Sequence, residues 1–311
     1  MSGTFSEWMN GSVRSLSLRG TLTFTDGESA ALSPGDLLSA SVSEGAADGL
    51  LLGSVLTNAC TARLSNEGGI WLPGGAKRGQ RPLIGAAVML ELGVKNGTET
   101  AYSPLCSFIV KSASAPQRGA VTLRGSGGLP GGFDEPFLDG LSYPLSLGAL
   151  VAALVAAGGG VLLNADFPGG ALTVASAPAW EGRTVRQALS CALTAAGCFM
   201  FCDASGALSV RRARDTSAAK NVPPACTISL LAPEPAFGPL AALRVGFRDR
   251  TECMFVNENA VSARHNTFSI EENPLFPKDT VQTETLGRAL LTSLSGLELP
   301  EGQIVFTGDP A

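Results

Sequence analysis

Residues 13–24, VRSLSLRGTLTF, alternate apolar and polar side chains and decide the fold class of the first third of the chain. The apolar positions that share one face at a period of two are Leu16, Leu18, Leu22 and Phe24. This period predicts a half-buried β-strand. Asp26-Gly27 follows two residues later, and these residue types tolerate the positive φ of a tight turn. The stretch therefore predicts a strand that opens a β-hairpin.

Further strands are predicted along the chain from this point. They cover residues 57–64, 85–94, 101–111 and 121–124. Asn96-Gly97, between the second and third of these runs, is the strongest hairpin signal in the sequence. A loop, GSGGLPGG at residues 125–132, follows the last run. Residues 1–125 are therefore predicted to form a first β-domain.

Residues 126–215 change character and predict a small α/β domain. Pro144 precedes an apolar run at 145–157, and proline is well placed near a first helical turn. Thr184 and Gln187 form a capping box that opens a second helix, which Gly197 ends. The predicted short strands are 161–164, 171–175, 198–203 and, as a hairpin partner of the last, 208–212.

The apolar run also has the length of a membrane span, since residues 145–163 carry no charge. Gly158-Gly159-Gly160 interrupts it, so only residues 145–157 can be continuous helix. No basic flank orients it as a span. We therefore expect a buried core helix and no membrane helix.

From residue 216 the β-character resumes and predicts a second β-domain, 216–311. The predicted strands are 227–231, 242–247, 253–256, 261–270 and 303–306. Prolines 223, 224, 233, 235 and 239 are expected in the loops between the early ones. A helix over 279–294 carries Leu286, Leu290 and Leu294 as an apolar stripe. The predicted fold class is mainly β with an α/β insert (α+β).

The composition limits the possible functions. The 311 residues include 22 Lys+Arg and 27 Asp+Glu, for a net charge of −5, and 16% are charged, where about 25% is usual. So poorly charged a surface indicates burial against partners. The acidic balance argues against tightly held nucleic acid. The N-terminus has no basic and apolar regions of a signal peptide.

Few residues are candidates for chemistry. Only one histidine is present, His265, which excludes a multi-histidine zinc site. A Ser-His-Asp triad would need it, but no nucleophile elbow occurs, so a surface or interface histidine is favoured. The glycine-rich residues 125–130 resemble a dinucleotide fingerprint, but no helix follows, and a flexible linker is favoured. No catalytic, cofactor-binding or metal-binding residue is therefore predicted.

Three remaining groups have structural explanations that we favour over functional ones. The seven cysteines are scattered and reduced, and Cys191, Cys198 and Cys202 are explained by core packing better than by a metal cluster. Asp134, Glu135 and Asp139 are candidate acids of a hydrolase, but carboxylates in a loop are usually solvated. The basic groups are Lys77-Arg78-Arg81 and Arg211-Arg212-Arg214. For them, solvated faces or ion pairs between subunits are favoured over phosphate binding.

The order of the segments carries more information than any motif. TLTFTDGESAALSPGDLLSASVSEG and LTNACTARLSN are followed by a hairpin, SPLCSFIVKSA and VTLRGSGGLPGGFDEPF. YPLSLGALVAALVAAGGGVLL, GRTVRQALSCALTAAGCFMFCDASGALSVRR and IVFTGDP then complete the chain. This succession resembles the baseplate-hub, or tail-associated, proteins of tailed bacteriophages, prophages and tailocins.

The resemblance implies a structural protein of the virion tail tip, assembled in the host cytoplasm. It implies a homotrimer in which residues 1–125 and 216–311 are β-barrel domains similar to the tail-tube protein, flanking an accessory α/β domain. Its partners would be the distal tail or tail-tube protein, the C-terminus of the tape-measure protein, and a central spike or receptor-binding proteins. DNA would pass its lumen only transiently, during genome ejection.

The chain also differs from that family, in which the GDP segment continues into further strands. Here the sequence stops at Ala311, which leaves open whether the second β-domain closes by itself. One alternative class is a β-rich surface or carbohydrate-binding module. Such sites need exposed Trp and Tyr, of which the chain has three and two.

Overall fold

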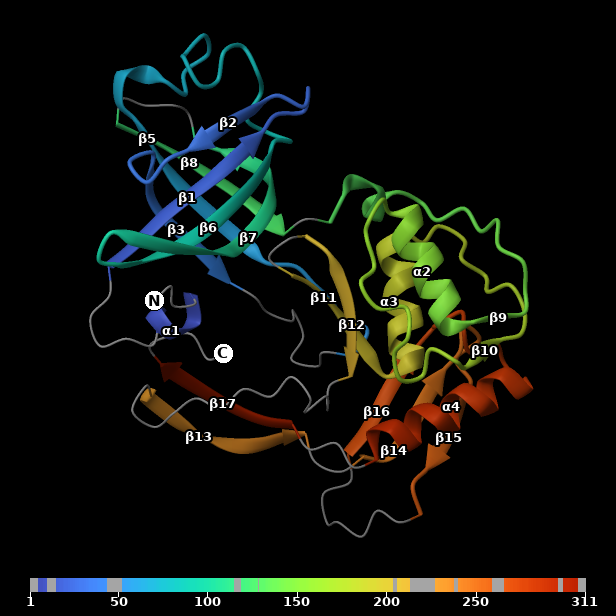
Figure 1. Cartoon of the computed structure of the whole chain (residues 1–311). Helices are drawn as coiled ribbons and strands as arrows, with labels where there is room; N and C mark the ends of the chain where they lie inside the picture. Colours follow the sequence, from blue (N-terminus) through green and yellow to red (C-terminus); the bar gives the residue numbers. More distant parts are fainter. Residues whose placement is uncertain are drawn as a thin grey trace.

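The computed structural model describes residues 5–9, 15–43, 52–114, 119–127, 129–203, 206–212, 227–237, 240–258, 266–295 and 299–306. Within them the chain is mainly β, with antiparallel sheets, as predicted, and α-helices pack beside short strands after the first sheet (Figure 1). A short helix, α1 (Phe5–Met9), precedes the first strand. Among the described residues, no helix combines the length and the apolarity that a membrane crossing needs.

Seven strands form the N-terminal sheet, in the order β2-β1-β6-β7-β8-β5-β3. Their bounds are β1 Ser15–Thr23, β2 Ser29–Leu32, β3 Leu37–Ser43, β5 Ala59–Asn66, β6 Ala87–Asn96, β7 Glu99–Ala113 and β8 Gly119–Gly127. Because β3 also contacts β1, the sheet curls into a barrel (Figure 1). Its core contains Trp71, Phe108 and Leu22, all fully buried.

Two predicted hairpins are confirmed in this barrel. Gly27, with φ 88°, turns the chain between β1 and β2. Asn96 pairs with Glu99, so the loop of the second hairpin is Gly97-Thr98, one residue later than Asn96-Gly97. Gly97 has φ 63° at the first loop position, where glycine adopts a left-handed backbone without steric cost.

The predicted apolar face of β1 is only partly buried. Leu22 and Phe24 are buried and Leu18 packs against the barrel core. Leu16, predicted on the same face, is 53% exposed. It lies near the start of β1, outside the stretch from Gly20 to Thr23 that β2 covers.

The two predicted helices of the α/β unit are confirmed. α2 (Leu147–Ala157) begins at Ser146, whose Oγ accepts a hydrogen bond from the Ala149 N–H. α3 (Val185–Ala196) begins with the predicted Thr184–Gln187 capping box and ends at Gly197, with φ 69°. The short elements around the helices are η2 Gly131–Asp134, β9 Leu145–Ser146, β10 Thr173–Val174, β11 Cys198–Cys202 and β12 Leu208–Arg212.

Two of the short strands expected here are reduced. The expected strand at 161–164 is a single bridge between Leu162 and Leu208. The one expected at 171–175 covers only β10, which pairs with β9. β11 and β12 form the predicted antiparallel hairpin.

Three strands were not predicted: β3, β9 and a short strand between β3 and β5. β4 (Val55–Leu56) comes from the segment between β3 and β5 and pairs in parallel with β11, Val55 opposite Met200. The Gly53 N–H extends this contact by donating to the Cys198 carbonyl over 2.8 Å. A segment between two barrel strands thus adds a third strand to the sheet of β11 and β12.

The C-terminal part contains a second small sheet, in the order β15-β14-β16, and a helix. Their bounds are β14 Leu240–Gly246, β15 Glu252–Val256, β16 Asn266–Glu271 and α4 Val281–Leu294. β16 runs parallel to β14. The predicted stripe of α4 is confirmed, since Leu286, Leu290 and Leu294 are buried.

β13 (Thr227–Phe237) pairs antiparallel with β17 (Leu299–Phe306) in a separate two-stranded sheet. The prediction that Pro233 and Pro235 lie in loops is wrong, because β13 runs through both. Register shifts flank them, and a two-stranded sheet leaves each strand one free edge. Proline is tolerated at such edges and bulges because it has no N–H to donate.

Two hydrophobic clusters hold the described residues together. One fills the barrel, from Leu22 to Leu123. The other extends from Leu129 to Leu294 and joins α2 and α3 to β14 and α4. Among the described residues the first cluster thus ends at Leu123 and the second begins at Leu129, and the second includes residues on both sides of 215, such as Val210 and Leu240.

Candidate functional site

The glycine-rich loop at 125–130 is explained by packing. Gly125 lies within β8, and a Cβ there would come within 2.0 Å of the Ile109 carbonyl oxygen of β7. η2, which begins at Gly131, is a single 3₁₀ turn. These residues present no helix N-terminus to a phosphate.

The three cysteines close in sequence lie in the core, as predicted. Cys191 is on the inner side of α3, and Cys198 and Cys202 lie on the buried face of β11. Burial raises the pKa of the Cys198 thiol to about 11, against the opposing charge of Arg212. In the described part of the chain, no three His, Cys, Asp or Glu side chains lie close enough to hold a metal ion. His265 lies outside the described residues.

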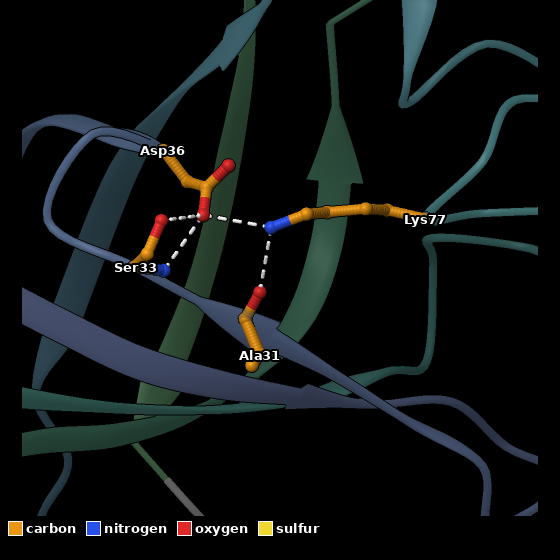
Figure 2. A network of polar contacts seen from close by, with 4 residues as sticks. All are labelled: Ala31, Ser33, Asp36 and Lys77. Carbon is orange, nitrogen blue, oxygen red and sulfur yellow. Dashed lines mark hydrogen bonds and ion pairs between the residues drawn. The ribbon is translucent and has the colours of Figure 1, made fainter.

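The first basic group is used within the chain, which corrects the expectation of solvated faces or pairs between subunits. Lys77 contacts Asp36 over 2.7 Å and donates to the Ala31 carbonyl of β2 over 2.8 Å (Figure 2). The Arg81 guanidinium lies 2.7 Å from Asp26. Arg78 donates to the Arg81 carbonyl over 2.7 Å. These contacts fasten the long loop after β5 across the hairpin of β1 and β2.

The second basic group is only partly described. The Arg211 guanidinium lies over the Phe201 ring, 4.5 Å from its centroid. Arg212 lies opposite Cys198 on β11, and its Nε is buried without a hydrogen-bond partner. Arg214 lies outside the described residues.

The acidic residues after Gly132 do not converge on one point. Asp134 pairs with Arg186 over 3.0 Å, and Glu135 is exposed. Asp139 accepts hydrogen bonds from the Tyr143 hydroxyl over 2.9 Å and the Leu141 N–H over 3.1 Å. Burial, together with this carboxylate, raises the pKa of Tyr143 to about 12. The contacts explain these side chains structurally.

The sequence did not indicate a groove that lies in the second core region of the described residues. It has a volume of about 420 Å³, within the range of ligand sites. It lies between residues 176–179, the β14–β15 turn and the segment between β16 and α4. Its apolar lining includes Ala177, Pro178, Phe247, Pro274, Phe276 and Pro277. Lys278 and Asp249 line it too, 2.7 Å apart.

The buried side chains of Gln282 and Asn273 and the half-buried side chain of Arg183 fix the shape of this groove. Gln282 of α4 accepts from the Ala175 N–H over 2.7 Å and donates to the Leu275 carbonyl over 2.8 Å. Asn273 donates to the Cys191 carbonyl over 2.9 Å. Arg183 donates to the Glu272 carbonyl over 2.7 Å. Three segments distant in sequence are thereby held together.

Backbone strain collects around the same groove. The non-glycine residues with positive φ in the described part of the chain are Arg250 at 64°, Glu272 at 49° and Asp279 at 55°. All three lie in the turns that border it. Strained residues persist where the surrounding structure over-determines them, often at functional sites. The residue types give no signal for these positive φ angles, because Arg, Glu and Asp are common in turns of any conformation.

The arrangement suits binding and assembly. The groove brings together apolar side chains, backbone groups and one ion pair, and its lining residues include neither a cysteine nor a histidine. The described residues thus form a β-barrel and an α/β unit, and a groove lies at the surface of the second hydrophobic cluster.

A comparison with protein-family models gives no match, and a comparison with curated proteins gives none. Solved structures do match. A tail protein from Neisseria meningitidis is 11% identical, with a TM-score of 0.47, over 88% of this chain and 74% of that one. The 43 kDa tail protein of prophage MuSo2 from Shewanella oneidensis is 12% identical, with a TM-score of 0.46, over 88% and 79%. The prophage tail protein gp18 from Listeria monocytogenes is 10% identical, with a TM-score of 0.46, over 82% and 73%. These are tail proteins, the class that the order of segments resembles.

Proposed function

We propose that the chain is a structural hub at the distal end of a phage or phage-like tail tube. Three copies would form a ring that adapts the sixfold tube to a threefold tip and surrounds the channel through which DNA leaves. The observation that carries the proposal is the order of the parts. A seven-stranded barrel comes first, an α/β unit second and further β-structure third.

The composition and surface fit this role. An acidic chain suits a channel wall along which DNA must slide without sticking. Large apolar side chains remain exposed, Ile84 of the barrel loop at 59% and Met254 of β15 at 53%. A ring also gives the free strand edges of β13 and β17 a neighbour to pair with.

The partners follow from the same proposal. The tail-tube or distal tail protein would contact the first barrel, and the tape-measure C-terminus would be held inside the ring. A spike or receptor-binding protein would contact the other side. β13 and β17 would belong to the second tube-like domain of the region 216–311, and the site of action would be the virion tail tip.

The alternative is a β-rich surface or carbohydrate-binding module, and the aromatic residues disfavour it. Trp71 is fully buried and Trp180 is 4% exposed. Tyr102 lies under the Arg19 guanidinium, 3.6 Å from it. Carbohydrate recognition would need such rings free on one face.

Native mass spectrometry of the purified chain tests the proposal. We expect a species of about 95 kDa, three times the 31.7 kDa chain, with ring-shaped particles by electron microscopy. A single-chain mass at all concentrations, also after the tail-tube protein of the same particle is added, would contradict the hub. Binding to an oligosaccharide array would then favour the module.

A further inference from the structure

One face of the sheet in the α/β unit carries apolar side chains that belong to neither core. Phe201 of β11 lies opposite Leu56 of β4, and both are half-buried. Val161 and Leu163 lie on the other side of β12 and are 65% and 59% exposed. Because side chains alternate along a strand, the neighbouring Met200 points to the opposite face, into the core. This apolar face is therefore turned away from α3.

A single cation covers the middle of this face. The Arg211 guanidinium stacks on Phe201, and no ion pair to a described carboxylate holds it. Asp203, at the adjacent turn, accepts a hydrogen bond from the Ala207 N–H. We name the residues Leu56, Val161, Leu163, Phe201 and Arg211 the Phe201 face.

A second surface has the complementary chemistry. Leu138 is 87% exposed, the highest value among the large apolar side chains of the described residues. Exposed carboxylates flank it at Glu135 and Asp139. Phe137, next to it, is buried with its ring 5.9 Å from that of Trp180 and anchors the segment. We name residues 135–139 the Leu138 knob.

The two surfaces cannot meet within one chain. The knob is fastened beside the first turn of α3, where the Val185 N–H donates to the Glu135 carbonyl and the Phe137 N–H donates to the Arg183 carbonyl. α3 packs on the core face of β11, and the Phe201 face is the other side of the same sheet. The helix and the sheet, which lie side by side in Figure 1, therefore separate the two surfaces.

We infer that the Leu138 knob of one copy docks on the Phe201 face of the next copy, with Glu135 and Asp139 beside Arg211. Two different patches in contact make a heterologous interface, and such interfaces close into rings when the rotation permits. The buried apolar contact would supply the affinity. The charges of Glu135, Asp139 and Arg211 would fix how the two surfaces align. The inference rests on the proposed function, because it names the contact between neighbouring copies in the proposed ring.

Cysteine cross-linking of full-length chains tests the contact. Leu138→Cys and Leu163→Cys variants, each also carrying Cys226→Ser and Cys253→Ser to remove native thiols that are not buried in the described structure, are purified separately, then mixed and treated with a short bis-maleimide linker. We expect a cross-linked dimer in the mixture and none in either variant alone, since the interface is heterologous. Val281→Cys is the matched control for Leu138→Cys, because Val281 is 83% exposed on α4. It is expected to give no dimer with Leu163→Cys.

Native mass spectrometry separates this inference from the proposed function. Leu138→Ser should weaken association about tenfold or more, the effect of losing an interface anchor, and Val281→Ser should not. A three-chain species that persists in Leu138→Ser and gives no 138–163 cross-link would overturn the inference alone. A single-chain mass for the unaltered protein at all concentrations, also after the tail-tube protein is added, and without cross-linking, would overturn both.

Discussion

The Lys77 ammonium lies 2.7 Å from the Asp36 carboxylate and thereby ties the long β5–β6 loop to the turn between β2 and β3. The Ser33 hydroxyl and N–H donate to the same carboxylate oxygen (Figure 2). Lys77 also caps a carbonyl of the edge strand β2, at Ala31. The pair thus stabilises the barrel at β2 and β3, the two edge strands of its sheet.

Lys77→Met should destabilise the protein by about 1–3 kcal/mol, because it leaves a mostly buried carboxylate without its charged partner. The Asp36 side chain is only 13% exposed. Urea unfolding followed by tryptophan fluorescence measures the change. Arg288→Met is the control, since its pair with Glu284 is largely solvent-exposed and its loss should leave the midpoint unchanged.

Acid should destabilise the barrel through Asp36. Burial acts to raise the pKa of Asp36, but hydrogen bonds from Lys77 and Ser33 outweigh it and hold the pKa below its ordinary value. A carboxyl whose folded-state pKa is depressed contributes stability above its unfolded pKa of about 3.9, and loses it as the pH falls through the folded value. Unfolding free energies between pH 6 and pH 3 should therefore fall less in Asp36→Asn than in the unaltered protein. Equal slopes, with Glu28→Gln at an exposed turn position as reference, would refute this.

Gly197→Ala should cost about 1–2 kcal/mol, more than Gly182→Ala. Both glycines have positive φ, 69° and 72°, so both substitutions strain the backbone. A Cβ at Gly197 would also lie 3.0 Å from Ser293 Oγ and 3.1 Å from a Leu290 methyl of α4, whereas one at Gly182 meets nothing within 4 Å. Equal losses of stability in the two variants, measured by thermal unfolding, would contradict this, because they would show that α4 moves to accept the new Cβ at no cost.

Gln282→Leu should destabilise the second core by about 1–3 kcal/mol, because it leaves the part-buried Ala175 N–H and the buried Leu275 carbonyl without their partners. Hydrogen exchange should show faster exchange at Ala175. Gln80→Leu, at an exposed position, is the control and should change neither. Unchanged exchange at Ala175 in Gln282→Leu would mean that the hydrogen bond from the Ala175 N–H to Gln282 does not hold this segment in place.

Local signals were readable from the sequence. The Thr184–Gln187 capping box, the stop at Gly197 and the stripe of α4 depend on residues within one or two turns. The hairpins at Gly27 and Gly97 likewise depend on neighbouring residues. Such patterns keep their meaning wherever the element packs.

Long-range pairings were not readable. β4 has only two residues, and nothing in them specifies a parallel partner as distant as Met200. The groove depends on Gln282, Asn273 and Arg183, which meet only in the folded chain. β13 continues through Pro233 and Pro235 because its edge tolerates them, which propensity alone cannot reveal.

The parallel pairing of β4 with β11 has a consequence in time. Val55 leaves the ribosome 145 residues before its partner Met200. At roughly 5–20 residues per second, that delay is about 7–30 s. β1–β3 precede Val55, and the remaining barrel strands, β5–β8, emerge within this delay, so all barrel strands are synthesised before the partner of β4 is available. Synthesis order thereby makes the finished barrel the template on which the α/β sheet closes.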